Sequence, residues 1–294
     1  MKNLLLAICL LITIDFQPAI ASPATPNDRR KLRSQFPPVI MYHEVREDKI
    51  YNSFDVRAEN FRRQLEWLKE QGYQTLSLDE LYSAYEQGDQ ETLSKAVVIT
   101  FDDGYLGNYE VAAPILAELG MKATFFIHLD SINLQDLIPN YPTMNWTQVQ
   151  ELDRNPLFSV YSHSISHPHL SELHQVEQRL ELQQSKLFYE DRLGGERPYF
   201  AYPYGNYDRR VIEEVQNAGY KLAFSVSDLG LFEMPVQFSI PRIYMGTIMS
   251  DLMFFQRCVL QYREMVAENN SICFEERWKP IDSATTDGDI TSIY

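Results

Sequence analysis

The sequence predicts an α/β fold with a parallel sheet, contained in one domain. From Pro38 onward, short uncharged runs alternate with helix-length amphipathic segments, as expected of successive strands and helices in a parallel sheet. The run Ala96 to Phe101 has no charge and is rich in β-branched residues, which is typical of a strand buried on both faces. A chain of 294 residues with 45% hydrophobic content can form one sizeable core, and α/β barrels of this length are often single domains.

Further strands are predicted where short apolar runs end at polar or turn-forming residues. In chain order, the predicted strands are Val39 to Tyr42, Ala96 to Phe101, Lys122 to Leu129, Leu157 to Tyr161, Tyr199 to Tyr202, Leu222 to Val226 and Ser239 to Ile243.

Helices are predicted where apolar residues recur at helical spacing. The segments Phe61 to Gln71 and Val111 to Leu119 are each followed by a glycine, a common helix end. Pro114 fits the second helix only if its first turn begins nearby. A third, more polar helix is predicted from Ser171 to Tyr189. Its inward-facing residues are expected to be Leu173, Val176, Leu180 and Leu187.

The N-terminus has the three-part pattern of a secretory signal peptide over residues 1–21. Lys2 precedes an apolar run from Leu4 to Ile14, and small residues follow around Ala21. The run is too short to span a bilayer, which takes about 20 residues. We therefore expect cleavage after Ala21, no stable membrane insertion, and an exported protein that is periplasmic or extracellular; an uncleaved anchor is the alternative.

The remaining boundaries follow from composition. Residues 22–36 are predicted to be a flexible linker, residues 37–278 the folded domain, and residues 279–294 a polar, acidic tail. Cleavage of the signal would leave Cys258 and Cys273 in the mature chain. A disulfide between them and two free thiols are both compatible with the sequence.

The charge balance restricts the class of partner. The chain has 26 basic and 41 acidic residues, a net charge of −15, which repels nucleic acid phosphates and anionic membrane surfaces. A neutral or cationic glycan suits this surface, although acidity can also serve solubility alone.

Polar clusters follow several of the predicted strands. Because the carboxyl ends of parallel strands open onto a shared crevice, these clusters should lie close together. They are His43, Asp102 with Asp103, His163 with His167, and Pro203-Tyr204-Gly205.

Two imidazoles and one carboxylate form a common ligand set for a divalent ion in hydrolytic sites. His163 and His167 supply the imidazoles, and Pro168 favours a loop over a helix for them. Such a pair can equally lie on the surface. Asp102 and Asp103 are more informative, because neighbouring carboxylates at the end of a buried strand repel each other and a bound cation would compensate. The alternative is an ordinary Asp-Asp-Gly surface turn.

Three segments together resemble the polysaccharide deacetylase family with the NodB homology domain. They are Thr100-Phe101-Asp102-Asp103-Gly104-Tyr105, Ser162-His163-Ser164-Ile165-Ser166-His167-Pro168 and Phe200-Ala201-Tyr202-Pro203-Tyr204-Gly205. The opening Pro38-Val39-Ile40-Met41-Tyr42-His43 and the segment from Ala218 to Phe224 are most similar to the branch that deacetylates exported poly-N-acetylglucosamine.

The resemblance implies a distorted (β/α) barrel forming a single catalytic domain. It also implies that Asp102 is the general base and that Asp103, His163 and His167 hold a divalent metal, usually zinc. The backbone N–H of Tyr204 is expected to help bind the oxyanion.

The chain departs from the family pattern in two places. Ala201 stands where many members have an arginine that fixes the base, and no histidine follows His174 to act as general acid. Arg242 could supply the missing cation or form a structural salt bridge. His43 is the first candidate for the acid, with His169 and reprotonated Asp102 as alternatives. Substrate contacts are expected from Pro203, Tyr204, Trp146 and Arg242.

The leading hypothesis is a metal-dependent enzyme that removes N-acetyl groups from an exported N-acetylglucosamine polymer. Chitin, peptidoglycan and acetylated xylan are alternative substrates of the same chemistry. A glycan-binding protein without turnover and a structural matrix protein are hypotheses of a different class.

Overall fold

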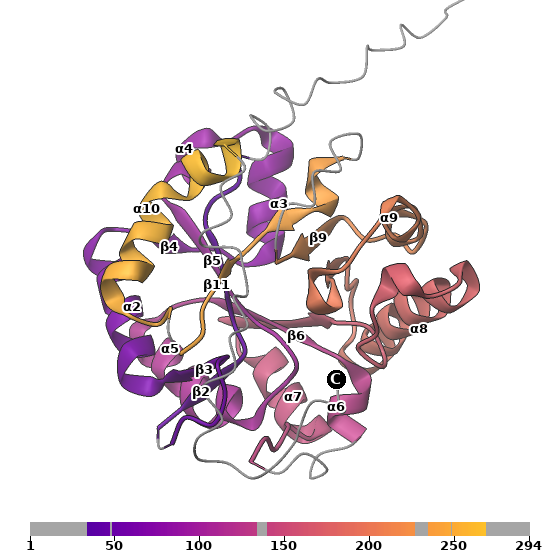
Figure 1. The fold of residues 1–294 in the computed structure, drawn as a ribbon, viewed down its shortest axis with the longest axis horizontal. Coiled ribbons are helices and arrows are strands. Elements are labelled where there is room, and N and C mark those ends of the chain that lie inside the picture. Colours follow the sequence, from indigo (N-terminus) through magenta and orange to yellow (C-terminus); the bar gives the residue numbers. More distant parts are fainter. Residues whose placement is uncertain (1–33, 48, 134–139, 227–234, 248, 269–294) are drawn as a thin grey trace, which may run out of the picture.

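The computed structural model describes residues 34–47, 49–133, 140–226, 235–247 and 249–268. Its centre is a parallel sheet rolled into a nearly closed barrel, and helices surround it (Figure 1). The barrel strands are β1 (Val39–Tyr42), β5 (Ala96–Phe101), β6 (Ala123–Ile127), β7 (Phe158–Ser162), β8 (Tyr199–Ala201), β9 (Leu222–Ser225), β10 (Ile240–Pro241) and β11 (Ile243–Tyr244). Their spatial order is β10-β9-β8-β7-β6-β5-β1-β11, so the predicted α/β barrel is confirmed.

Two smaller groups of strands flank the barrel. The short strand β4 (Gln74–Thr75) pairs with β5. The strands β2 (Glu44–Arg46) and β3 (Asp55–Arg57) form a separate two-stranded sheet. The segment between β2 and β3 returns to the barrel end where β1 stops, and its residues Asn52 and Phe54 line a cavity there.

The chain closes the barrel within a single short segment. β10 pairs with β9 through Ile240 and Phe224, whereas β11 pairs with β1 through Ile243 and Ile40. The prediction of one continuous strand from Ser239 to Ile243 was therefore wrong. The chain leaves one sheet edge and joins the other at Arg242, which belongs to neither strand.

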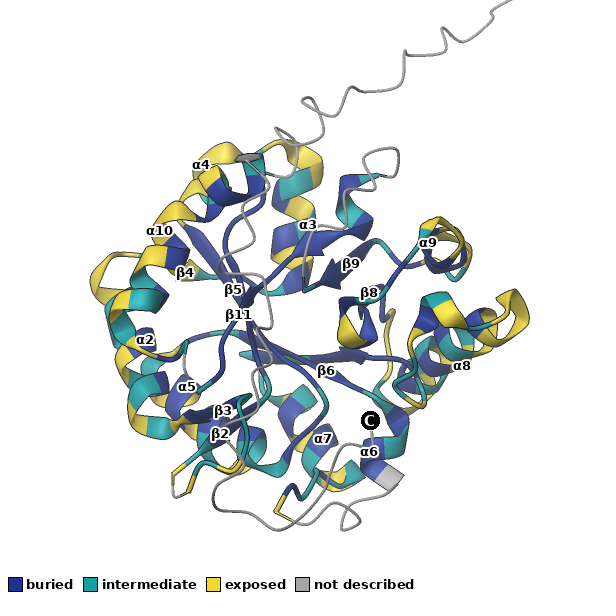
Figure 2. Ribbon diagram, in the orientation of Figure 1, coloured by how far each residue is buried: buried dark blue, intermediate teal, exposed yellow. Residues whose placement is uncertain are grey.

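Helices cover the outside of the barrel, with buried residues turned toward the strands and exposed residues toward solvent (Figure 2). Helix ends follow local capping rules: Ser77 and Glu80 form a capping box at the start of α3, and Gly88 ends that helix in the left-handed conformation. The helices are α2 (Ala58–Glu70), α3 (Leu78–Gln87), α4 (Gln90–Ser94), α5 (Ala113–Leu119), α6 (Leu129–Asn133), α7 (Trp146–Arg154), α8 (Gln175–Leu193), α9 (Arg209–Asn217) and α10 (Leu252–Glu268), with short turns η1 (Asn108–Ala112), η2 (Leu170–Glu172), η3 (Pro203–Gly205) and η4 (Val236–Phe238).

The predicted helix around Pro114 is divided in two. A π-helical turn, η1, precedes α5, and Pro114 lies in the first turn of α5. A proline is tolerated there because the first N–H groups of a helix have no partner inside the helix.

The predicted inward face of α8 was wrong. Val176, Leu180 and Leu187 are exposed, at 68%, 51% and 55% of their surface. Gln178 and Ser185 face inward instead, and both are hydrogen-bonded: Gln178 donates to the Leu170 carbonyl, and Ser185 accepts from Ser162. Apolar periodicity missed this face because buried polar groups with partners are tolerated.

The structure bears on the predictions made for the two ends of the chain. Phe36 does not belong to a linker, because its ring is buried and stacks on Tyr85 at 4.6 Å between centroids. Cys258 is buried in α10 and disulfide-bonded, while Cys273 lies outside the described residues. The predicted signal peptide and the acidic tail also lie outside them. Within the described ranges, no helix has the length and apolarity needed to cross a bilayer.

Candidate active site

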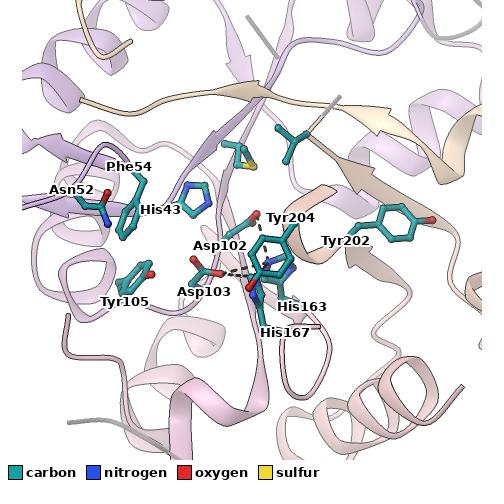
Figure 3. Close-up of a pocket in the computed structure, with 12 residues that line it drawn as sticks. His43, Asn52, Phe54, Asp102, Asp103, Tyr105, His163, His167, Tyr202 and Tyr204 are labelled. Atoms are coloured by element: carbon teal, nitrogen blue, oxygen red, sulfur yellow. Dashed lines mark hydrogen bonds and ion pairs between the residues drawn. The ribbon is translucent and has the colours of Figure 1, made fainter. Parts of the chain in front are cut away.

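A cavity of about 290 Å³ lies where the carboxyl ends of the barrel strands meet (Figure 3). His43 follows β1, Asp102 and Asp103 follow β5, and His163 follows β7. The parallel sheet brings these strand ends to one side of the barrel, which is why residues far apart in sequence converge. The cavity is lined by Met41, His43, Asn52, Phe54, Asp102, Asp103, Tyr105, His163, His167, Tyr202, Tyr204 and Val226.

Asp102 forms a buried, two-bond ion pair with Arg242. Arg242 Nη1 donates to Oδ1 at 2.8 Å and Nη2 donates to Oδ2 at 2.6 Å. The guanidinium also donates to the Ser225 carbonyl and to Thr100 Oγ1, so both its position and its orientation are fixed. Arg242 is fully buried and contacts Asp102 instead of lining the cavity.

The ion pair decides the charge of Asp102. Burial raises the pKa of this carboxyl, but the positive charge of Arg242 and the hydrogen bonds that Arg242 donates lower it by more, so its pKa falls below the ordinary value. Asp102 is therefore an ionised carboxylate at the cavity and can accept a proton.

Three further side chains direct ligating atoms at one another. Asp103 Oδ1 lies 3.5 Å from His163 Nε2 and 3.3 Å from His167 Nε2. The two Nε2 atoms are 3.2 Å apart. A divalent ion bound by all three atoms would have one carboxylate and two imidazole ligands, a set found in hydrolytic metal sites.

The hydrogen bonding of His163 tests whether these residues fit a metal. Its Nδ1 lies 2.8 Å from the Ala201 carbonyl oxygen. Because a carbonyl only accepts, Nδ1 must carry the proton. Burial lowers the pKa of His163 well below its usual value, so the ring is neutral and Nε2 presents a lone pair to the Asp103 carboxylate. Two electron-rich atoms facing each other need a cation between them, and an N–H donated to a carbonyl is the usual support of a metal-bound imidazole. The residues therefore fit a divalent ion.

The loop that carries the two histidines is held in an unusual backbone conformation. Ser164 and His167 have φ of 73° and 56°, which is uncommon outside glycine. Ser164 Oγ accepts the His167 N–H at 3.0 Å. Glu181 of α8 accepts the N–H groups of Ile165 and Ser166, at 2.8 and 3.1 Å, and the Ser166 hydroxyl at 2.7 Å. These bonds fix the loop without the regular bonds of a helix.

His43 lines the same cavity as Asp102. Its Nδ1 is buried and has no hydrogen-bond partner among the described residues. Phe54 and Tyr244 pack beside the ring, with centroids at 5.7 and 5.6 Å. A buried ring nitrogen without a protein partner is suited to contact a bound molecule.

Tyr204 lies next to the loop that carries His163 and His167. Its backbone has φ of 57°, and its ring centroid lies 4.5 Å from His167 and 4.0 Å from His169, nearly parallel to the latter. Pro203 is buried beside it and does not line the cavity. Trp146 does not line the cavity either. Its indole packs against Phe188, with ring centroids 5.2 Å apart.

Asn52, Phe54 and Glu181 were not singled out from the sequence. Asn52 and Phe54 lie in a short segment after β2 that has no recognisable motif. Glu181 lies on a polar helix face where acidic residues are common. None of the three could be identified from the sequence, because their relevance depends on which segments meet at the cavity.

Comparison with known proteins gives a consistent assignment. Residues 89–223 match the family model described as polysaccharide deacetylase. The Bacillus subtilis (strain 168) protein YxkH, whose name provisionally assigns it to the polysaccharide deacetylases, is 32% identical over 185 residues, which cover 63% of this chain and 62% of that protein. The poly-beta-1,6-N-acetyl-D-glucosamine N-deacetylase of Escherichia coli (strain K12) is 24% identical over 299 aligned positions, covering 87% of this chain and 44% of the relative.

Solved structures agree on the fold. The Streptococcus pyogenes deacetylase PplD, in complex with acetate, superimposes with a TM-score of 0.62 at 25% identity, covering 81% of this chain and 98% of that one. IcaB from Ammonifex degensii gives a TM-score of 0.63 at 23% identity, covering 75% of this chain and 97% of that one.

The fold and site thus define a NodB-type α/β barrel protein. Over residues 89–223 the chain is similar to the polysaccharide deacetylase family. It spans 62% and 44% of the length of the two curated relatives named above.

Proposed function

We propose that this protein is an exported hydrolase that removes N-acetyl groups from an N-acetylglucosamine polymer with the help of a divalent ion, most simply zinc. The observation that carries the proposal is the placement of an ionised carboxylate, Asp102, beside three converging ligands, Asp103, His163 and His167. A base and a metal ligand set at one cavity are the two components that metal-assisted hydrolysis requires.

Asp103, His163 and His167 would hold the ion. When bound, a divalent ion supplies positive charge that lowers the pKa of a water molecule and polarises an acetyl carbonyl. Asp102 accepts a proton from the attacking water, and the water oxygen forms a bond to the acetyl carbon. Arg242 keeps both carboxylate oxygens of Asp102 in a fixed orientation for this transfer.

The negative charge that develops on the acetyl oxygen needs donors in place before the reaction. The backbone N–H of Tyr204 is our candidate, because Tyr204 lines the cavity beside His167. Collapse of the tetrahedral intermediate breaks the carbon–nitrogen bond and releases acetate.

The departing nitrogen must receive a proton to leave as an amine. His43 is our first candidate for this general acid, because it lines the cavity and its Nδ1 has no partner within the described part of the chain. His169 and Asp102, after it has accepted the proton from water, are the alternatives. Arg242 takes the place of the family arginine that is missing at Ala201, and this argues against a protein that only binds glycan.

The choice of polymer rests on the relatives. Several curated relatives are named poly-beta-1,6-N-acetyl-D-glucosamine N-deacetylases, from Escherichia coli and Staphylococcus aureus. We extend that substrate class to this chain. Export rests on the signal-like pattern of residues 1–21.

The test is acetate release from purified poly-N-acetylglucosamine, chitin oligomers, peptidoglycan and acetylated xylan by the zinc-loaded protein. We expect the highest kcat/KM on poly-N-acetylglucosamine. Asp102→Asn should lower kcat by at least about 100-fold, since it removes the base and keeps the shape of the side chain. Faster release from another polymer would correct the substrate, and glycan binding without acetate release from any polymer would contradict an enzyme.

A further inference from the structure

One wall of the cavity takes no part in the steps above. It consists of Asn52 and Phe54, from the segment between β2 and β3, and Tyr105, which follows β5. Figure 3 shows these side chains on one side of the Asp103 carboxylate and Tyr204 on the other. We call Asn52, Phe54 and Tyr105 the Phe54 wall.

The Phe54 ring is partly exposed and is supported by other aromatic rings. Its centroid lies 5.5 Å from Tyr105, with planes 14° apart, and 5.2 Å from Tyr141. Tyr105 and Tyr141 are buried and fix its position, while part of the Phe54 surface lines the cavity. Apolar area left in water is unfavourable by about 25 cal/mol per Å², so a ligand with an apolar face is favoured here.

Asn52 adds a polar group to this wall. Its Oδ1 accepts the Ser53 N–H at 2.6 Å and lies 3.3 Å from the Ser53 hydroxyl, which also donates to it. Both hydrogen bonds are accepted by Asn52 Oδ1, and they fix the orientation of the side-chain amide. Its Nδ2 makes no hydrogen bond within the described ranges and is a donor for an acceptor in the cavity.

The segment that carries both residues is fixed in advance. The Asn52 N–H donates to Asp55 Oδ2 at 3.1 Å, and the Asn52 carbonyl accepts from Thr247 Oγ1 at 2.8 Å. The Thr247 N–H donates to the Ser53 carbonyl at 2.7 Å. A Cβ at Gly246 would lie 2.2 Å from that carbonyl oxygen, so only glycine permits this approach. A wall that is already ordered loses little entropy when a ligand binds.

We propose that the Phe54 wall is a subsite for the sugar unit next to the one that carries the reacting acetyl group. This proposal rests on the proposed function. A β-linked sugar ring has an apolar C–H face, which would cover Phe54, and peripheral hydroxyl or acetamido oxygens, which would accept from Asn52 Nδ2. The protein then prefers linked sugars to an isolated acetyl group.

The test compares two substrates for the full zinc-loaded chain. One is a series of β-linked N-acetylglucosamine oligomers of increasing length, and the other is 4-methylumbelliferyl acetate, which has no sugar. We expect kcat/KM of the wild type to rise from one sugar to two or more. Asn52→Ala and Phe54→Ala should each lower the oligomer-to-ester ratio of kcat/KM by about tenfold, mainly through KM. Phe54→Leu, which keeps apolar packing, should fall in between and guards against a variant that fails to fold.

Tyr51→Ala is the matched control, because Tyr51 is an aromatic residue of the same segment that is 39% exposed and does not line the cavity. It should keep the wild-type ratio. Unchanged ratios in Asn52→Ala and Phe54→Ala would overturn the subsite, and so would an equal loss in Tyr51→Ala. If the wild type cleaves the ester and no glycan, the proposed function fails; the subsite is then overturned if calorimetry gives equal oligomer affinity for wild type and Asn52→Ala.

Discussion

At the scale of single residues, the Asp102–Arg242 pair connects the fold to the chemistry. Both side chains are buried, and Nη1 and Nη2 of Arg242 donate to the two different carboxylate oxygens of Asp102. Removing one partner from such a pair typically costs about 3–5 kcal/mol, because the other charge is left buried. Breaking the pair should therefore destabilise the fold as well as disturb the orientation of the proposed base.

Arg242→Lys should lower kcat by about 100-fold with a small change in KM, because a lysine cannot donate to both oxygens and a misplaced base reacts slowly. Steady-state kinetics on the preferred polymer checks this. Arg179→Lys is the control, since Arg179 forms a similar two-bond pair with Glu214 but is 49% exposed. Equal losses in the two variants would mean that Arg242 has no special relation to the base.

Sequence reasoning offered Arg242 either as the cation for the base or as a structural salt bridge. It could not choose, because the pairing depends on how the barrel closes. Arg242 lies 140 positions after Asp102, between two strands that pair with opposite edges. By contrast, the adjacent Asp102 and Asp103 were identified directly, since a run of uncharged residues leads into them.

A second buried acid predicts a pH effect on stability. Burial raises the pKa of Glu44 from 4.5 to about 8; Arg46 opposes this shift, and Asp55 and Glu110 add to it. Glu44 therefore keeps its proton in the folded protein over a range where the unfolded chain has lost it. Its contribution to stability is complete below the unfolded pKa and is lost as the pH rises through about 8.

In the wild type, the free energy of unfolding should fall as the pH rises from 4.5 to about 8. In Glu44→Gln this fall should be smaller by about 1–3 kcal/mol, because the amide does not ionise. Urea denaturation at several pH values measures the effect. Glu86→Gln, at an exposed position, is the control. The same pH slope for wild type and Glu44→Gln would show that Glu44 is already ionised in the folded state.

At the scale of elements, α8 positions the loop that carries both histidines. Its Glu181 accepts two backbone N–H groups and one hydroxyl from that loop. We expect Glu181→Ala to weaken zinc binding by about 10- to 100-fold, as found for groups that orient metal ligands. Competition with a zinc chelator of known affinity gives the dissociation constant.

Asp191→Ala is the matched control for this experiment, because it removes an exposed carboxylate from the same helix. It should leave zinc affinity unchanged. Unaltered affinity in Glu181→Ala would mean that the loop keeps its shape without α8.

Elements differed in how well the sequence predicted them. The bounds of β1 and β5 were predicted correctly, because short apolar runs with turn residues on both sides leave little choice. The inward face of α8 was wrong because Gln178 and Ser185 are buried with partners. The helices α3 and α7 were not predicted, although both begin with a capping box.

At the scale of the whole molecule, the barrel brings three candidate metal ligands from separate segments close to one point. The family resemblance predicted this barrel, and the strand order confirms it. The resemblance could not predict the segment between β2 and β3 at the cavity, since its position depends on contacts with residues near Gly246 and Thr247. Trp146 was expected near substrate because it is a large aromatic residue close to the predicted loops, yet it packs against α8.

Because the candidate metal ligands come from two different strand ends, a bound ion should stabilise the whole fold. Zinc at about 100 times its Kd would add about 2.7 kcal/mol, which corresponds to a rise in Tm of about 5–10 °C for a domain of this size. Thermal unfolding with zinc and with chelator measures it. His163→Ala should lose this rise, and equal Tm values for the wild type in both conditions would exclude a specific ion at this site.

We propose that deacetylation by this protein depends on a single ion held by Asp103, His163 and His167. The most direct test is to remove metal with a chelator and titrate zinc back while recording acetate release from poly-N-acetylglucosamine. We expect no release without metal, a linear rise that ends near one equivalent of zinc per chain, and no rise in Asp103→Asn. Full activity in the metal-free protein, or an equal rise in Asp103→Asn, would contradict it.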